Sequence, residues 1–169
     1  MPVARGDADR DAVTEPGRMR SDDGDDDDDV LSRNKDVVLR FLDAGHRADM
    51  ATVDSLITDD VMKFGPRPSS PFPSPVRGRE NLLAGYHHWV FQPRSISMEV
   101  ERVIAEGDLV AVQFILRAIT AKGEPYESFY HFLFQCEGGR VKSFWEYVDT
   151  QYAQRMLFDD RPDPEDGAG

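Results

Sequence analysis

Several residue types and patterns are scarce in this 169-residue sequence, and each absence excludes a class of protein. Cys136 is the only cysteine, so the chain has no internal disulfide and no metal site with several cysteine ligands. No apolar run approaches the roughly 18 residues that a membrane-spanning helix needs. The N-terminus lacks the apolar stretch of a secretory signal, and metal-ligand spacings such as H-x-x-x-H are absent. We therefore expect a cytoplasmic protein that binds no membrane, no metal and no other cofactor.

Negative charge is concentrated at the two ends of the chain. Residues 1–29 contain eleven acids and four bases, and residues 159–169 contain five acids and one base, so they contribute -7 and -4 to the formal net charge of -12. The body between them carries only -1. A run such as DDGDDDDDV repels itself and offers almost nothing to bury. We expect disordered acidic tails at 1–32 and 159–169 around one domain at 33–158, and no nucleic-acid partner, because the body has no basic patch.

The first half of the body has the periodicity of helices. Apolar residues at 37, 38, 41 and 42 predict one helix with a buried stripe, ending near Gly45. Asp49 is a suitable N-cap for a short second helix, and residues 59–64 predict a short strand. Five prolines within residues 65–75 predict a loop. A third helix is expected over residues 78–91.

From residue 95 onwards the pattern changes to that of strands. A meander of four antiparallel strands is predicted by two runs within 95–120, a third over 124–135 and a fourth over 140–150. A short helical stretch follows, which Asp149 or Thr150 would cap. Helices that precede strands indicate an α+β fold. We expect a curved antiparallel β-sheet wrapped around three N-terminal helices, a cone-shaped α+β barrel that encloses an apolar cavity for a small organic ligand.

Three segments of this sequence occur in an order that resembles a known family. FLDAGHRADMATVDSLITDDVMKF (41–64) and VRGRENLLAGY (76–86) resemble the nuclear transport factor 2-like superfamily, which includes the ketosteroid isomerases. YHFLFQCEGGRVKSFWEYVDT (130–150) is similar to the end of its SnoaL-like polyketide cyclase branch. The likeness spans about residues 33–158 and implies the same barrel and a cofactor-independent cyclase or isomerase.

The resemblance also implies catalytic residues. In the cyclases an aspartate after the strand tryptophan is the acid/base, and Glu146 holds that position here, whereas His131 matches a histidine of the same pocket. Our hypothesis is that Glu146 removes a proton alpha to a carbonyl of a small apolar, polyketide-type substrate and that His131 stabilises the oxyanion. A glutamate between Phe144 and Val148 would be partly desolvated, which suits a base. The expected substrate-binding residues, taken to line the cavity, are Phe144, Val148, Leu133, Phe129, Trp89, Phe114 and Tyr86.

Other branches of the superfamily fit less well. The isomerase base would fall near Phe64 or Gly65, where no acid occurs, and Arg117 lacks the acid two residues later that the limonene-epoxide-hydrolase-like members use. Scytalone-dehydratase-like members need two pocket histidines from the meander, which has only His131.

A ligand-binding or dimerising module without chemistry is the alternative that stays open. The glutamate in place of the family aspartate favours it. We further expect a homodimer, since one face of the sheet would otherwise expose Tyr130, Phe132 and Trp145.

Overall fold

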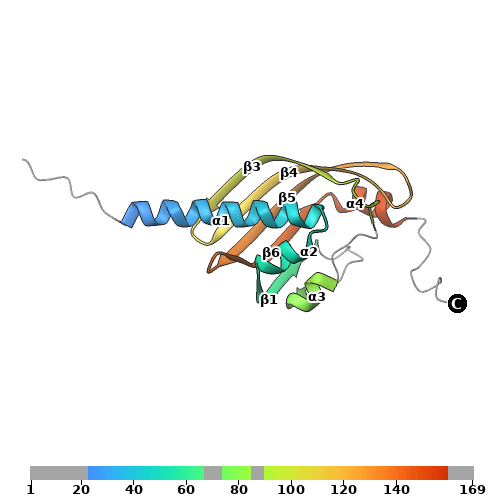
Figure 1. Cartoon of the computed structure of the whole chain (residues 1–169). Coiled ribbons are helices and arrows are strands. Elements are labelled where there is room, and N and C mark those ends of the chain that lie inside the picture. The colour runs from blue at the N-terminus through green and yellow to red at the C-terminus, as the bar shows by residue number, and fades with distance from the viewer. Residues whose placement is uncertain (1–22, 67–73, 85–89, 160–169) are drawn as a thin grey trace, which may run out of the picture.

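A long helix packed across one face of a curved, six-stranded sheet forms the architecture (Figure 1). The computed structural model describes residues 23–66, 74–84 and 90–159. The helical elements are α1 (Asp23–His46), α2 (Met50–Ser55), α3 (Arg79–Ala84), α4 (Thr150–Ala153) and the π-helical turn η1 (Gln154–Phe158). The strands are β1 (Ile57–Phe64), β2 (Val76–Arg77), β3 (Ser97–Glu106), β4 (Leu109–Ile119), β5 (Pro125–Glu137) and β6 (Arg140–Val148). The predicted α+β class is confirmed.

The sheet has the strand order β2-β1-β6-β5-β4-β3. Strands β3 to β6 form the expected antiparallel meander. Two features differ from the expectation: β1 pairs with β6 in parallel, and the two-residue strand β2 adds to the edge beyond β1. Within the described residues the edge strands β2 and β3 do not pair with each other, so the sheet is open rather than a closed barrel.

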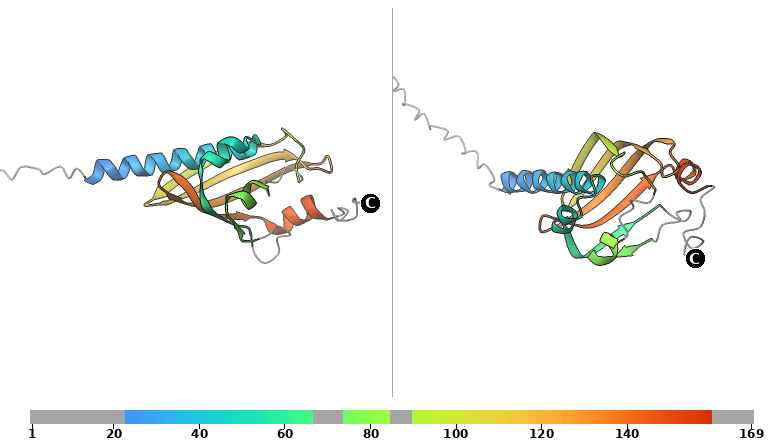
Figure 2. Two further views of the ribbon diagram at one scale, coloured as in Figure 1. Left: turned by 60° about the horizontal axis from the view of Figure 1, so that its bottom comes forward. Right: turned by 45° about the vertical axis from the view of Figure 1, so that its right-hand side comes forward.

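The core lies between α1 and the concave face of the sheet. Phe41 of α1 is buried and makes edge-to-face contacts with Phe134 and Phe144, at ring-centroid distances of 5.8 and 5.3 Å. Val38 and Leu42 are buried on the same helix, as the helical spacing predicts. Two further views show that α1 lies across one side of the sheet and projects beyond it at its N-terminal end (Figure 2).

Helix α1 begins at Asp23, inside the segment predicted to be a disordered tail. The prediction is therefore wrong for residues 23–32, while residues 1–22 and 160–169 lie outside the described residues. Asp26 and Asp27 lie in the first turns of the helix, where the positive end of the helix dipole stabilises negative charge. The helix then continues without a break into the turns that the core holds.

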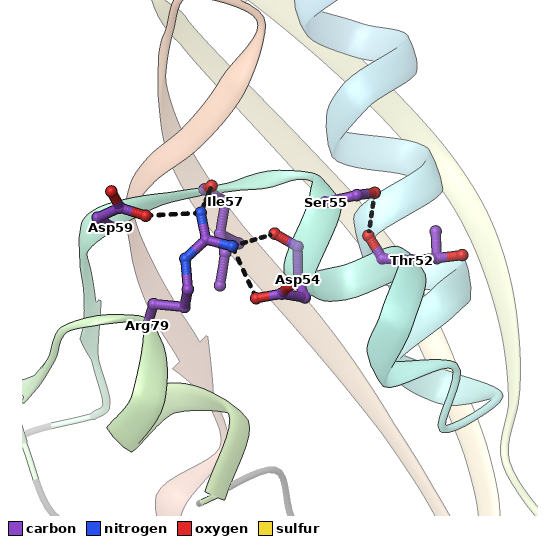
Figure 3. Close-up of polar contacts among 6 residues, drawn as sticks. All are labelled: Thr52, Asp54, Ser55, Ile57, Asp59 and Arg79. Atoms are coloured by element: carbon purple, nitrogen blue, oxygen red, sulfur yellow. Dashed lines mark hydrogen bonds and ion pairs between the residues drawn. The ribbon is translucent and has the colours of Figure 1, made fainter.

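Arg79, in the G-R-E segment, fixes α3 to the junction of α2 and β1 (Figure 3). Its Nη1 donates to the carbonyl oxygen and the carboxylate of Asp54, at 2.9 and 2.7 Å. Its Nη2 donates to the carbonyl oxygen of Ile57 at 3.0 Å and pairs with Asp59 at 2.8 Å. These carboxylates hold the pKa of Arg79 above its ordinary value. The clamp positions α3 and β1, which both line the cavity described below.

A β-bulge sets the register between β5 and β6. At the hairpin end, Glu137 pairs with Arg140 and Cys136 with Val141. Pairing then resumes with Gln135 opposite Ser143, which leaves Lys142 as one additional residue in β6. From this point on, every residue of β5 faces a partner one position later than an uninterrupted hairpin would give it.

Matched substitutions on α1 test its placement on the sheet. Val38 is 0% exposed and Val30 is 36% exposed. Val38→Ala is expected to lower the free energy of unfolding by about 1–3 kcal/mol, because it removes two buried methyl groups and leaves a void. Val30→Ala is expected to change it by less than about 0.5 kcal/mol. Denaturant unfolding measures both, and equal losses would contradict the described packing.

Candidate functional site

A cavity of about 140 Å³ lies between the C-terminal end of α1 and the concave face of the sheet. Most of its wall is apolar. The lining residues come from the helices as well as from the strands of the sheet. The apolar lining is Leu42, Val76, Leu82, Val90, Phe91, Ile96, Phe114, Leu116, Phe132, Phe144 and Leu157. Four side chains with polar groups complete the wall, namely His46, Lys63, Tyr130 and Glu146. An apolar hollow with a few converging polar groups is typical of a small-molecule site.

Glu146 and Lys63 form an ion pair in this wall. The Lys63 Nζ lies 3.3 Å from Oε2 of Glu146, and the two side chains are only 14% and 17% exposed. Lys63 reaches the cavity because parallel pairing sets it opposite Phe144 of β6, on the same face as Glu146. The ammonium stabilises the carboxylate charge in surroundings that otherwise disfavour it.

Tyr130 brings a second polar group into the wall, supported by Tyr126 behind it. Their hydroxyl oxygens lie 3.0 Å apart in a buried hydrogen bond. Burial, together with the nearby Tyr126 and the charge of Glu146, raises the pKa of Tyr130 well above its ordinary value. Tyr130 therefore stays protonated. When Tyr126 donates to Tyr130, the Tyr130 proton is available to a ligand oxygen.

His46 lies in the last turn of α1, at the same cavity. Its ring packs edge-on against Phe114 with the ring centroids 5.9 Å apart. Burial lowers the pKa of His46 to about 4, against a smaller opposing effect of Asp43. The imidazole is therefore neutral near pH 7. Its Nδ1 is buried and has no hydrogen-bond partner among the described residues.

His131 does not lie beside Glu146. It occupies the opposite face of the sheet, near Tyr147 at a ring-centroid distance of 6.0 Å. The reason is the bulge at Lys142. An uninterrupted hairpin would set His131 opposite Glu146, whereas in the structure Phe132 lies opposite Glu146 and His131 opposite Tyr147.

The same shift affects the other residues expected from β5. Leu133 lies opposite Trp145, away from the cavity, and Phe129 is 65% exposed on the same outer face. Their expected places in the cavity wall, like that of His131, are therefore wrong. Tyr130 and Phe132, expected on the outside, line the cavity instead.

The remaining candidates divide into three groups. Phe144 and Phe114 line the cavity, whereas Val148 packs on the core and lines the larger outer groove described below instead. Tyr86 and Trp89 lie outside the described residues. Asp149 caps α4 by accepting from the backbone N–H groups of Gln151 and Tyr152, as predicted.

Neither Arg117 nor Cys136 supplies chemistry to the cavity. Arg117 is an exposed residue that pairs with Glu99 and Glu127, at 2.7 and 2.5 Å. Burial raises the pKa of the Cys136 thiol to about 11, so it is no nucleophile near neutral pH.

Glu146 also borders a second hollow of about 560 Å³ at the point where β1 ends beside β6. Phe64, Gly65, Pro66 and Trp145 contribute to its wall, and the rings of Phe64 and Trp145 stack with their centroids 5.1 Å apart. Glu146 is the one described residue that lines both hollows. Its carboxylate therefore stands between the small inner cavity and a larger outer groove.

The described residues contain neither a group of metal ligands nor a membrane-spanning helix. In residues 23–66, 74–84 and 90–159, no three His, Cys, Asp or Glu side chains are grouped so as to hold a metal ion. None of the helices in these ranges is long and apolar enough to cross a membrane.

Comparison with known families defines the class of protein. Residues 38–144 match the SnoaL-like domain family, and the chain therefore belongs to this family. No curated protein matches the chain by sequence.

Three solved structures of similar fold are named for different activities or ligands. A putative SnoaL-like polyketide cyclase from Jannaschia sp. CCS1 is 22% identical with a TM-score of 0.67, over 86% of this chain and 100% of that one. An epoxide hydrolase of the limonene-epoxide-hydrolase-like type from M. tuberculosis is 21% identical with a TM-score of 0.60, over 75% and 90%. TerC, co-crystallised with polyporic acid, is 15% identical with a TM-score of 0.65, over 74% and 98%. At these identities the likeness establishes the fold alone.

Sequence reasoning missed three of the four polar residues of the wall. Lys63 shares the inward face of β1 with the buried Val61, a signal present in the alternation of DDVMKF. Tyr130 was placed on the wrong face because the bulge has no clear sequence signature. His46 lies at the expected end of the first helix, four residues after the buried Leu42, and this helical spacing is the signal that could have found it.

The pH dependence of stability tests the environment of His46. Its pKa is about 4 in the folded protein against 6.5 for an ordinary histidine. Between these values the unfolded chain binds a proton that the folded protein does not, so stability falls as the pH falls from about 6.5 to about 4, by roughly 3 kcal/mol in total. The difference in unfolding free energy between wild type and His46→Leu should shrink by about that amount over this window. The same comparison with His131→Leu is the control, and a pH-independent difference for His46→Leu would contradict a buried neutral imidazole.

Proposed function

We propose that this protein is a cofactor-independent cyclase or isomerase that removes a proton alpha to a carbonyl of a small, mainly apolar substrate. The observation that carries the proposal is the carboxylate of Glu146 in the wall of an apolar cavity, 3.3 Å from Lys63. Membership of the SnoaL-like family, matched over residues 38–144, supports the reaction class. Glu146 lies two residues beyond that match, and only the sequence resemblance sets it at the position of the family aspartate.

The reaction would begin at Glu146. The carboxylate takes the alpha proton and becomes a carboxylic acid, while the electrons of the broken C–H bond move into an enolate. In an isomerisation the carboxylic acid returns the proton to another carbon. In a ring closure the enolate carbon instead attacks a second carbonyl of the same molecule, and the new alkoxide takes up the proton.

Tyr130 and Lys63 are the donors that would stabilise the enolate oxygen. Tyr130 keeps its proton and is backed by the hydroxyl of Tyr126 at 3.0 Å. The ammonium of Lys63 is already next to the base. Donors that are fixed before reaction in a site of low dielectric constant stabilise developing negative charge most effectively. These residues replace His131 in the role of oxyanion partner.

The volumes of the two hollows suggest how a substrate would fit. A cavity of about 140 Å³ is close to the ~150 Å³ cavity that holds a benzene molecule. It would take one ring of the substrate, with the reacting carbon beside Glu146. Any larger, polyketide-derived remainder would lie in the outer groove of about 560 Å³ that Glu146 also borders.

A binding function without chemistry is the second candidate. The ion pair favours it, since Lys63 already neutralises the carboxylate that would have to act as the base. The small volume of the inner cavity, about 140 Å³, also favours a binding function. In this case the protein would hold an apolar ligand, and Glu146 would serve only to orient it.

Proton abstraction by Glu146 can be tested with a single-ring probe. 3-Cyclohexen-1-one isomerises to 2-cyclohexen-1-one by loss of an alpha proton and protonation at the gamma carbon. Wild-type protein in D₂O is expected to accelerate both deuterium exchange and isomerisation, as followed by ¹H NMR. Glu146→Gln should lose about 10²–10⁴-fold of that acceleration, the usual contribution of a general base.

Two control variants define the outcome. Glu146→Asp keeps a carboxylate and should retain part of the activity, while Glu124→Gln removes an exposed carboxylate and should behave as wild type. Turnover by Glu146→Gln at the wild-type rate would show that Glu146 is not the base. If wild type itself gives no acceleration, the binding function is favoured.

We also propose that the protein is a homodimer formed through the outer face of the sheet. Ile104, Phe129 and Tyr147 are 64%, 65% and 53% exposed, and the strand registers set them on the face that points away from α1. Exposed apolar side chains on three strands of one face, here called the outer patch, favour burial against a partner. This patch differs from the one first expected, since Tyr130 and Phe132 face the cavity. Trp145 does lie on the outer face, where Phe64 stacks on it.

Sedimentation velocity tests the dimer. Wild type at micromolar concentration is expected to sediment as a dimer, and Phe129→Arg should shift it to a monomer by placing a charge in the patch. Val30→Arg changes an exposed apolar residue elsewhere and should leave the dimer intact. A wild-type monomer over the micromolar range would refute the proposal.

A further inference from the structure

His46 is a cavity residue to which the proposed reaction assigns no task. It stands in the last turn of α1, whereas Glu146, Lys63 and Tyr130 all come from strands. The imidazole lines the same cavity as these residues and packs edge-on against Phe114. It is therefore held in place by the core and faces a space large enough for one ring.

The hydrogen-bonding capacity of this imidazole is unused. The buried Nδ1 has no hydrogen-bond partner among the described residues. A buried polar atom without a hydrogen-bond partner destabilises the fold, so its presence calls for an explanation. In its neutral form the ring offers one nitrogen that accepts and one N–H that donates. A ligand group that both donates and accepts would match it.

The cavity wall around His46 limits the kind of ligand group that can bind there. Leu42, Gly45 and Phe114 provide no charged partner. Burial keeps the ring neutral above a pKa of about 4, so an anionic group would find no positive charge here. A hydroxyl group satisfies a neutral imidazole at little desolvation cost, unlike a carboxylate or an ammonium.

We propose that His46 is a specificity-determining residue that binds a hydroxyl group of the ligand, so that the cavity selects hydroxylated cyclic carbonyl compounds over their deoxy analogues. This deepens the proposed function and rests on it for the carbonyl group. The ligand ring would then be held at two points, by its hydroxyl at the end of α1 and by its carbonyl at the sheet.

The experiment compares two probes that differ in one hydroxyl group. Dissociation constants of 4-hydroxycyclohexanone and cyclohexanone are measured by NMR titration on wild type, His46→Leu, His46→Gln and His131→Leu. Wild type should bind the hydroxyketone about 3- to 10-fold more tightly than the ketone, the range expected for one hydrogen bond. The preference should vanish in His46→Leu and return in part in His46→Gln, which keeps an acceptor and a donor.

His131→Leu is the matched control, because it makes the same change on the opposite face of the sheet. It should keep the full preference. The proposal is overturned if His46→Leu discriminates as wild type does, or if wild type binds neither probe or both equally. Glu146→Gln separates this proposal from the proposed function, since it should lose proton exchange and still prefer the hydroxyketone. If Glu146→Gln loses proton exchange but keeps its preference for the hydroxyketone, the role proposed for His46 is supported.

Discussion

The site depends on one local constraint, the β-bulge at Lys142. Pairing at the tip of the β5–β6 hairpin and pairing farther along differ by one residue, and a shift of one residue turns every side chain of a strand to the other face. The bulge therefore decides that Tyr130 and Phe132 share the cavity-facing side of the sheet with Glu146, while His131 lies on the opposite side. Lys142 itself stays at the rim, where its ammonium binds Glu137 at 2.8 Å.

The second determinant is the parallel pairing of β1 with β6. It sets Lys63 opposite Phe144, beside the position that Glu146 occupies on the same face. Arg79 holds the start of β1 and the start of α3 together through Asp54, Ile57 and Asp59. A carboxylate, an ammonium and a phenol from three strands are in this way brought together at one wall of an apolar hollow. Because the carboxylate and the ammonium are the costly groups to bury, each stabilises the other, and this pairing lets a charged group face the cavity.

Sequence reasoning predicted the parts of the fold that follow from periodicity and local chemistry. The helical stripe of α1, the Asp49 and Asp149 caps and the four-stranded meander depend on nearby residues, and each is found. The face of β5 was not predictable, because aromatic residues occur on both sides of that strand and the bulge shifts the alternation of β6, where Val141 and Phe144 are both buried. The ion pair of Glu146 with Lys63 joins residues far apart in the sequence, so only the pairing of β1 with β6 reveals it. The helical start of α1 does not follow from charge repulsion alone, because the positive end of the helix dipole offsets part of that repulsion.

The arrangement of the site therefore depends on the register of β5 against β6, and backbone NOEs measure that register directly. In isotopically labelled protein, cross-strand contacts are expected between Phe132 and Glu146 and between His131 and Tyr147. Contacts between His131 and Glu146 would instead show a hairpin without the bulge. That result would set His131 on the same face as Glu146 and Tyr130 on the opposite face, and it would contradict the arrangement of base and oxyanion donor described here.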